Sequence, residues 1–160
     1  MSIRLNSKPR FKLDQLKKPM DQLKRTTKKK RLSPKERAAL GLKPSEDEIQ
    51  TQIINECQYL KYMGIRVSEI IRHIPNGGLR SKSEAARLKR MGVKAGTPDL
   101  LIPVGKHGFI ALWIECKTED GDFLDSQIEQ IPLLQKLGNK VVVCRTVADA
   151  INTIKAYLEI

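Results

Sequence analysis

The stretch GTPDLLIPVGKHGFIALWIECK, residues 96–117, decides the fold. It holds two mainly apolar runs, 99–104 and 109–117, separated by a short segment that contains Gly105 and Gly108. Short apolar runs that are bounded by glycine-containing segments and rich in β-branched and aromatic residues predict β-strands. Because the connection is so short, we expect the two strands to lie next to each other in one sheet.

The second of these strands has two chemically different faces. Alternate side chains of a strand share a face, so Glu115 and Lys117 point to one side and Cys116 to the other. The Cys116 face is wholly apolar and is expected to be buried; it also carries Ile110, Leu112 and Ile114. Adjacent strands can bring Asp99 and Glu115 together at one end of the sheet, with Lys117 beside them.

Two carboxylates at a sheet edge form a hard-oxygen site that suits Mg²⁺ or Mn²⁺, and the backbone carbonyl of Cys116 can supply a further oxygen. Such an ion lowers the pKa of a bound water and stabilises the leaving oxygen of a phosphodiester. Lys117 can orient or deprotonate the attacking water, or neutralise charge on the phosphorus. The alternative is an ordinary Pro-Asp turn and a cross-strand ion pair. The combination on consecutive strands favours a nuclease.

The remainder of residues 45–160 predicts a mixed α/β domain with helices packed on a central sheet. A capping box at Ser45 and Glu48 opens the first helix, and Pro132 is expected to kink the third. We expect helices over 45–63, 83–91, 125–137 and 147–158, and strands over 67–74, 99–104, 109–117 and 140–145.

The excess positive charge lies in the first quarter of the chain. Residues 1–44 hold fifteen Lys or Arg against three acids, whereas residues 45–160 hold fifteen of each sign. We expect residues 1–44 to be a largely disordered basic extension with a short helix from Ser33. Lys and Arg displace counterions from phosphates, so a nucleic acid is the favoured partner. A solubilising tail, or contact with a protein or an acidic membrane, is the alternative.

The cysteines Cys57, Cys116 and Cys144 are far apart and set in apolar surroundings, without a CxxC pair. This pattern supports neither a zinc site nor a disulfide framework, and predicts small buried core residues in a reducing compartment. No apolar run reaches the roughly 18 residues of a membrane span, and the N-terminus lacks an apolar signal region. We therefore expect a soluble intracellular protein.

Pro98-Asp99 followed by Glu115-Cys116-Lys117 resembles the PD-(D/E)xK nuclease signature, and the surrounding sequence resembles its VRR-NUC branch. The matching segments are Glu46-x-x-Ile49-Gln50, His73 to Arg80, Gly92 to Asp99, Ile114 to Lys117, Gln127 and Gly138. The resemblance implies a restriction-endonuclease-like fold, dependence on Mg²⁺ or Mn²⁺, and cleavage of branched DNA. Stand-alone phage and bacterial members resemble Holliday-junction resolvases that act as homodimers.

The resemblance also draws attention to Gln127, on the first turn of its helix, which is expected to steady the water or the phosphate. The family usually has a Ser at the N-cap of this helix, where this chain has Leu124, so Asp125 or Ser126 is expected to cap instead.

A basic stretch lies directly before Asp99 and is interpreted as a phosphate clamp, the alternative being a solvated helix face. It comprises Arg80, Lys82, Lys89, Arg90 and Lys94. Asn76 and Gly77 form a turn that can let a DNA backbone approach closely, and His73 is expected to be structural or to face DNA.

Glu46 and Glu48 both begin the first helix, and helical geometry separates them. The apolar stripe of that helix spans about 80° at 100° per residue, and contains Ile49, Ile53, Cys57 and Leu60. Glu46 falls inside the stripe, at about 60°, whereas Glu48 falls near −100°. We therefore expect Glu46 to join the site and Glu48 to complete the capping box, although Glu46 also suits the helix dipole.

Together these features predict a metal-dependent, structure-selective DNA endonuclease, of the Holliday-junction resolvase type, in the cytoplasm of a bacterium or a phage-infected cell. The alternatives are a sequence-specific or nicking restriction-type nuclease and a non-catalytic nucleic-acid-binding protein.

Overall fold

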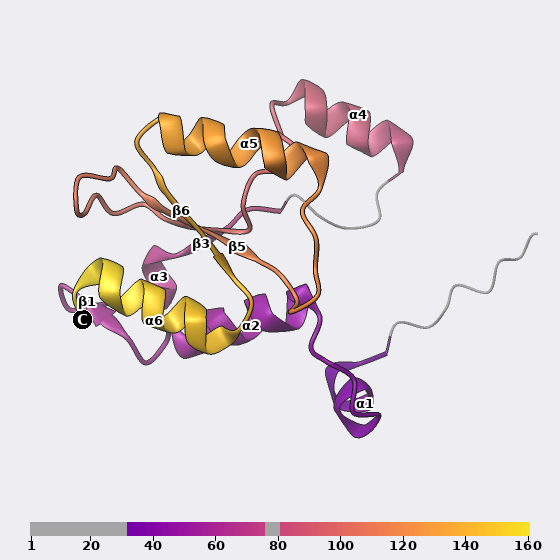
Figure 1. The fold of residues 1–160 in the computed structure, drawn as a ribbon, viewed down its shortest axis with the longest axis horizontal. Helices are drawn as coiled ribbons and strands as arrows, with labels where there is room; N and C mark the ends of the chain where they lie inside the picture. Colours follow the sequence, from indigo (N-terminus) through magenta and orange to yellow (C-terminus); the bar gives the residue numbers. More distant parts are fainter. Residues whose placement is uncertain (1–31, 76–80) are drawn as a thin grey trace, which may run out of the picture. The chain divides into compact units, whose positions relative to one another are not determined.

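A mixed four-stranded sheet holds Glu115 in one of its strands, with Asp99 and Lys117 directly next to strand ends (Figure 1). The computed structural model describes residues 32–75 and 81–160. Within this part of the chain the strand order is β3 (Arg72–His73), β4 (Leu100–Ile102), β5 (Leu112–Cys116) and β6 (Lys140–Cys144). Strand β4 runs antiparallel to both β3 and β5, whereas β5 and β6 are parallel. The predicted mixed α/β domain with a central sheet is confirmed, and the sheet has mixed strand orientation.

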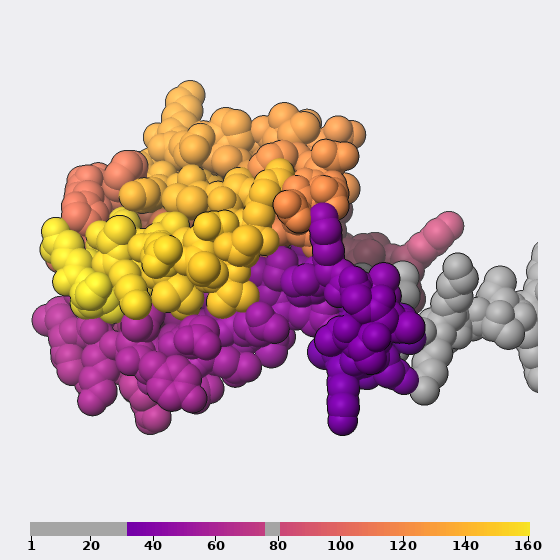
Figure 2. All heavy atoms as spheres, turned by 60° about the horizontal axis from the view of Figure 1, so that its bottom comes forward, coloured from indigo at the N-terminus to yellow at the C-terminus, as the bar shows by residue number. Residues whose placement is uncertain are grey.

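Helices cover both faces of this sheet. In Figure 1, α5 (Asp125–Lys136) lies on one side, and α2 (Glu46–Glu56) and α6 (Val147–Leu158) lie on the other. Figure 2 shows the yellow atoms of α6 directly against the purple and magenta atoms of the chain around α2. The core between these helices and the sheet is apolar and almost fully buried; it includes Ile53, Cys57, Leu112, Ile114, Cys116, Ala150 and Ile154. This burial is the main stabilising contribution to the fold.

The buried face of β5 is shorter than the sequence predicts. Leu112, Ile114 and Cys116 are at most 1% exposed, but Ile110 is 63% exposed. The strand begins only at Leu112, because residues 106–109 form a tight turn with an isolated bridge between Lys106 and Phe109. The expectation that Ile110 is buried is therefore wrong.

The segment after α2 also differs from the prediction. The helix ends at Glu56, and a hairpin of β1 (Lys61–Tyr62) and β2 (Ile65–Arg66) follows. Met63 and Gly64 both have positive φ, 52° and 81°, as a two-residue hairpin turn of type I′ requires. Gly64 thus belongs to a hairpin turn, and the helix expected over residues 45–63 is shorter than predicted.

The strand expected over residues 67–74 is largely wrong. Residues Val67–Ile70 form the short helix α3, and only Arg72 and His73 pair with β4. Val67 and Ile71, spaced four residues apart, are the buried members of this segment, and the amide of Ile71 donates to the carbonyl of Val67. Apolar residues at helical spacing, rather than at the two-residue period of a strand, explain the difference.

The other helices agree closely with the sequence. The short helix predicted from Ser33 is α1 (Pro34–Ala39), which a capping box of Ser33 and Glu36 opens, and α4 (Lys82–Arg90) occupies the predicted basic segment. Pro132 lies inside α5. The N-cap of α5 is Leu124 rather than Asp125 or Ser126, because the side-chain oxygen of Gln127 accepts a hydrogen bond from the Leu124 amide, at 3.0 Å.

The three cysteines are free and buried, as predicted. Burial raises the pKa of the Cys57 thiol to about 11 and raises the pKa values of Cys116 and Cys144 as well. Among the described residues, no helix has the length and apolar character that crossing a membrane requires.

Gly96 brings the loop before β4 into contact with the first turn of α5. Its φ is +77°, and a Cβ atom there would lie 2.0 Å from the carbonyl oxygen of Ser126 and 2.7 Å from the amide nitrogen of Gln127. Only glycine allows this approach, which brings the loop that leads to Asp99 close to the backbone of Gln127.

We predict that Gly96→Ala lowers the free energy of unfolding by about 3 kcal/mol or more, because the new methyl group meets backbone atoms as well as an unfavourable φ. Gly138→Ala is the matched control: φ there is +84° but nothing lies within 4 Å of the added Cβ. It should cost only about 1 kcal/mol. Equal losses for the two variants in urea unfolding would contradict the close approach at Gly96.

Candidate active site

Asp99 is held at the end of the sheet by its neighbours on both sides. Its Oδ2 accepts a hydrogen bond from the Cys116 amide at 2.8 Å, and its carbonyl accepts from the Ile74 amide at 2.8 Å. Burial raises the pKa of the Asp99 carboxyl, and the negative charge of Glu46 also raises it, against the lowering effect of the Cys116 hydrogen bond. The predicted meeting of Asp99 with the end of β5 is present.

Glu115 is buried, with 1% of its surface exposed. Its Oε1 lies 3.2 Å from Lys117 Nζ and accepts a hydrogen bond from Gln127 Nε2. Its Oε2 is also buried, yet no atom of the described residues hydrogen-bonds to it. Burial and the nearby Asp99 charge raise the pKa of Glu115 to about 7. A buried acceptor without a partner is costly, so this oxygen is suited to a cation.

Lys117 is 4% exposed, and its Nζ lies between two carboxylates. It is 3.2 Å from Glu115 Oε1 and 3.4 Å from Glu46 Oε1. Burial alone would lower the pKa of Lys117, but the hydrogen bonds and charges of Glu115 and Glu46 raise it above its usual value. In this arrangement the amine stays protonated.

The structure separates Glu46 from Glu48. Glu46 contacts Lys117, whereas Glu48 Oε2 accepts a hydrogen bond from the Ser45 amide at 2.5 Å and lies 3.2 Å from Arg37 Nε. Glu48 thus completes the capping box, and its side chain is engaged there. Glu46 is the acid of this helix that reaches the site.

Gln127 is buried against Glu115. Its Nε2 donates to Glu115 Oε1, while its Oε1 accepts from the Leu124 amide, which fixes the orientation of the side-chain amide. In the structure Gln127 therefore holds the Glu115 carboxylate in place. Its expected contact with water or phosphate stays a prediction.

Gln50 has no role of its own in the predictions from sequence, and in the structure its side chain pairs with His73. Gln50 Nε2 and His73 Nδ1 form a hydrogen bond between α2 and β3. Gln50 lies four residues after Glu46 and so shares its helix face, which is the signal in the sequence that could have found it. The positive charge of a protonated His73 would lower the pKa of Asp99, so His73 lies close enough to influence the site.

The oxygen atoms that could hold a divalent cation are the carboxylates of Asp99 and Glu115 and the backbone carbonyl of Cys116. Within the described part of the chain, no three His, Cys, Asp or Glu side chains converge on one point. A site of two carboxylates completed by a backbone carbonyl is compatible with this. The unpartnered Oε2 of Glu115 fits such an ion.

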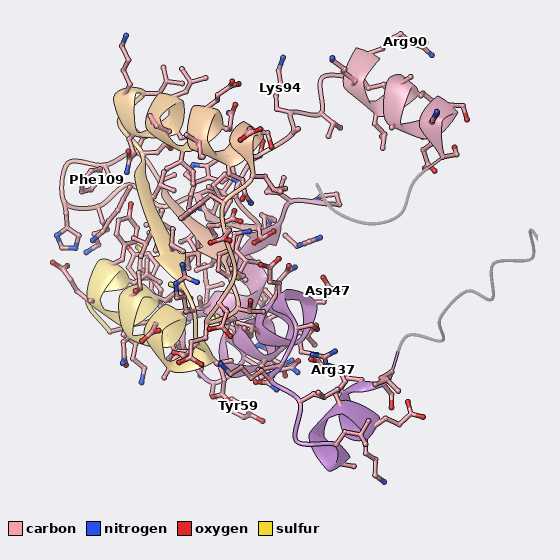
Figure 3. All side chains as sticks on the ribbon, turned by 45° about the vertical axis from the view of Figure 1, so that its right-hand side comes forward. Arg37, Asp47, Tyr59, Arg90, Lys94 and Phe109 are labelled. Atoms are coloured by element: carbon pink, nitrogen blue, oxygen red, sulfur yellow. The ribbon has the colours of Figure 1, made fainter. Side chains whose placement is uncertain are left out.

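The predicted DNA-contacting residues are only partly described. Lys82, Lys89 and Arg90 are exposed on α4, and Figure 3 shows Arg90 and Lys94 extending away from the sheet. Arg87 shares an open hollow on the same helix with Arg90. Arg87 is absent from the predicted basic stretch, although its i, i+3 spacing to Arg90 indicates a shared face. Asn76, Gly77 and Arg80 lie outside the described residues.

We predict that Glu115→Gln stabilises the metal-free protein increasingly as pH rises from 5 to 8. Between its usual pKa and about 7, folded Glu115 holds a proton that the unfolded chain has lost, so stability falls as pH rises. Glutamine removes this loss, which is on the order of 3 kcal/mol. The check is the difference in melting temperature between the two proteins in EDTA. A difference in melting temperature that stays constant or shrinks as pH rises would contradict the raised pKa of the buried Glu115 carboxyl.

Comparison with known proteins agrees with this geometry. A model of the VRR-NUC domain matches residues 44–148. A solved structure described as a VRR_NUC domain protein is 35% identical, with a TM-score of 0.64; the match covers 72% of this chain and 89% of that chain. No curated protein matches the chain. The matched region contains the acids, the lysine and the glutamine of the site, and the chain belongs to the VRR-NUC family of nucleases.

Proposed function

We propose that this protein is a divalent-metal-dependent endonuclease that hydrolyses phosphodiester bonds in DNA. The observation that carries the proposal is the buried Glu115 carboxylate, which has one oxygen paired with Lys117 and Gln127 and the other left without a partner. A binding module has no need of acids clustered where phosphates approach, so this arrangement favours catalysis over the non-catalytic alternative.

Asp99, Glu115 and the Cys116 carbonyl would hold Mg²⁺ or Mn²⁺, which supplies a bound water of lowered pKa and stabilisation of the leaving oxygen. The protonated Lys117 offsets negative charge that develops on the phosphate in the transition state. Glu46 and Glu115 hold that amine from two sides. Gln127 holds the Glu115 carboxylate in turn.

The proposed substrate is branched DNA, above all a four-way junction. The basic residues on α4 and the positive charge of residues 1–44 support binding to phosphates. A junction is resolved by two symmetric cuts, which a two-fold homodimer would supply with two sites. A sequence-specific or nicking nuclease is the second candidate among enzymes.

The test is cleavage of four-way junction, flap, single-stranded and duplex DNA with Mg²⁺, Mn²⁺ or EDTA. We expect metal-dependent cutting of the junction, and a loss of about a hundredfold or more in Lys117→Met, because a preorganised charge at the reacting phosphate is removed. The matched control is Lys155→Met on α6, which removes an exposed lysine away from these contacts. Equal activity of Lys117→Met and wild type would reject the site. Preferential cutting of plain duplex would favour the second candidate.

Glu46 and Glu48 allow a second prediction. Glu46→Gln removes a charge that contacts Lys117, so cleavage should fall by tenfold or more while the melting temperature changes little. Glu48→Gln should keep cleavage and lower the melting temperature, because it weakens the capping box and the pair with Arg37. The reverse ranking in matched cleavage and melting measurements would move the acid to Glu48.

A further inference from the structure

The turn that follows Lys117 is tied to the end of β6 by one arginine. Arg145 Nη1 donates to the carbonyl oxygens of Thr118, Glu119 and Gly121, at 2.6, 2.9 and 3.0 Å. The turn itself is closed by a hydrogen bond from the Gly121 amide to the Thr118 carbonyl at 3.1 Å. Hydrogen bonds from a charged donor are stronger than neutral ones. The guanidinium therefore fixes the path of the backbone over residues 118–121.

This turn contacts both members of the Lys117–Glu46 pair. Lys117 immediately precedes it, and the Lys117 amide makes a 3.0 Å hydrogen bond to the Cys144 carbonyl. On the other side, a Cβ added to Gly121 would lie 3.3 Å from Glu46 Oε1. A change in the turn would therefore move the backbone of Lys117 and the space that the Glu46 carboxylate occupies.

A second cation contacts the same turn but cannot fix it as firmly. Lys43 Nζ lies 2.8 Å from Glu119 Oε2 and 3.0 Å from Asp120 Oδ2. All three side chains are well exposed, and exposed ion pairs of this kind contribute little to stability and are screened by salt. In addition, Lys43 contacts the side chains of Glu119 and Asp120, whereas Arg145 contacts the backbone carbonyl oxygens of the turn.

We propose that Arg145 is a positioning residue for the cleavage reaction: by fixing the turn at 118–121 it keeps Lys117 and Glu46 within ion-pair distance of each other. The inference rests on the proposed nuclease function. Arg145 acts through the turn and does not touch the substrate. An arginine near a nuclease site can also contact a DNA phosphate directly, but three carbonyl oxygens already surround Nη1.

The first test is the kinetics of junction cleavage by Arg145→Ala, Arg145→Lys and Lys155→Ala. A misplaced lysine should lower kcat by roughly 10- to 100-fold in Arg145→Ala, with KM for DNA changed by less than about twofold. Arg145→Lys, which keeps one donor nitrogen, should fall between that variant and wild type. Lys155→Ala, which removes an exposed lysine on α6, should match wild type. Methylguanidinium should restore part of the kcat of Arg145→Ala, while KCl of equal ionic strength should not.

A raised KM with unchanged kcat in Arg145→Ala would overturn the proposal and assign Arg145 to phosphate binding. An equal loss in Lys155→Ala, or unchanged kinetics in both arginine variants, would overturn it as well. Gly121→Ala acts on the same turn without removing a charge, because the added Cβ would lie 2.9 Å from Thr118 Oγ1 and 3.3 Å from Glu46 Oε1. Its effect on kcat should therefore be strongly non-additive with that of Arg145→Ala in a double-mutant cycle.

The second test does not depend on cleavage. Amide hydrogen exchange should become faster at Gly121 and Lys117 in Arg145→Ala, because the turn loses its three carbonyl contacts, while exchange in α6 stays as in wild type. Unchanged protection at Gly121 would overturn the proposal. If wild-type protein cuts none of the DNA substrates, the nuclease proposal fails, and the exchange measurement still decides whether Arg145 fixes the turn.

Discussion

The burial of one carboxylate beside one lysine is the constraint on which the rest of the site depends. Glu115 and Lys117 are both nearly inaccessible to solvent, and each would be costly to bury alone. Their contact offsets part of this cost, but the second oxygen of Glu115 stays without a partner among the described residues. Three neighbouring contacts form a shell that keeps this buried pair in place. Glu46 contacts Lys117, Gln127 contacts Glu115, and the Cys116 amide donates a hydrogen bond to Asp99.

Three separate parts of the fold supply that shell. The N-terminus of α2 brings Glu46, the first turn of α5 brings Gln127, and the loop through Gly96 brings Asp99. The mixed sheet makes this convergence possible, because the antiparallel pair β4–β5 places Asp99 beside Cys116 while the parallel strand β6 extends the ladder past Lys117. Hence a site with few residues still depends on the packing of distant segments.

The sequence predicted the parts of this arrangement that follow from local rules. Strand alternation placed Glu115 and Lys117 on one face, and helical geometry distinguished Glu46 from Glu48. It failed where the same residue suits two local structures: Gly64 can end a helix or turn a hairpin, and Val67 to Ile71 can be a strand or a helical turn. The contacts of Arg145 and of Gly96 join segments far apart in the chain, so no local sequence pattern predicts them.

The burial of the three cysteines makes the protein convenient for spectroscopy. Thiolates, not thiols, react with maleimides and similar reagents, and burial with a raised pKa keeps Cys57, Cys116 and Cys144 protonated and inaccessible. A single cysteine introduced on the exposed face of α4 would therefore be labelled selectively in the otherwise unmodified chain. A dye or spin label placed there would report the approach of nucleic acid in real time, without a cysteine-free background that would disturb the core beneath β5.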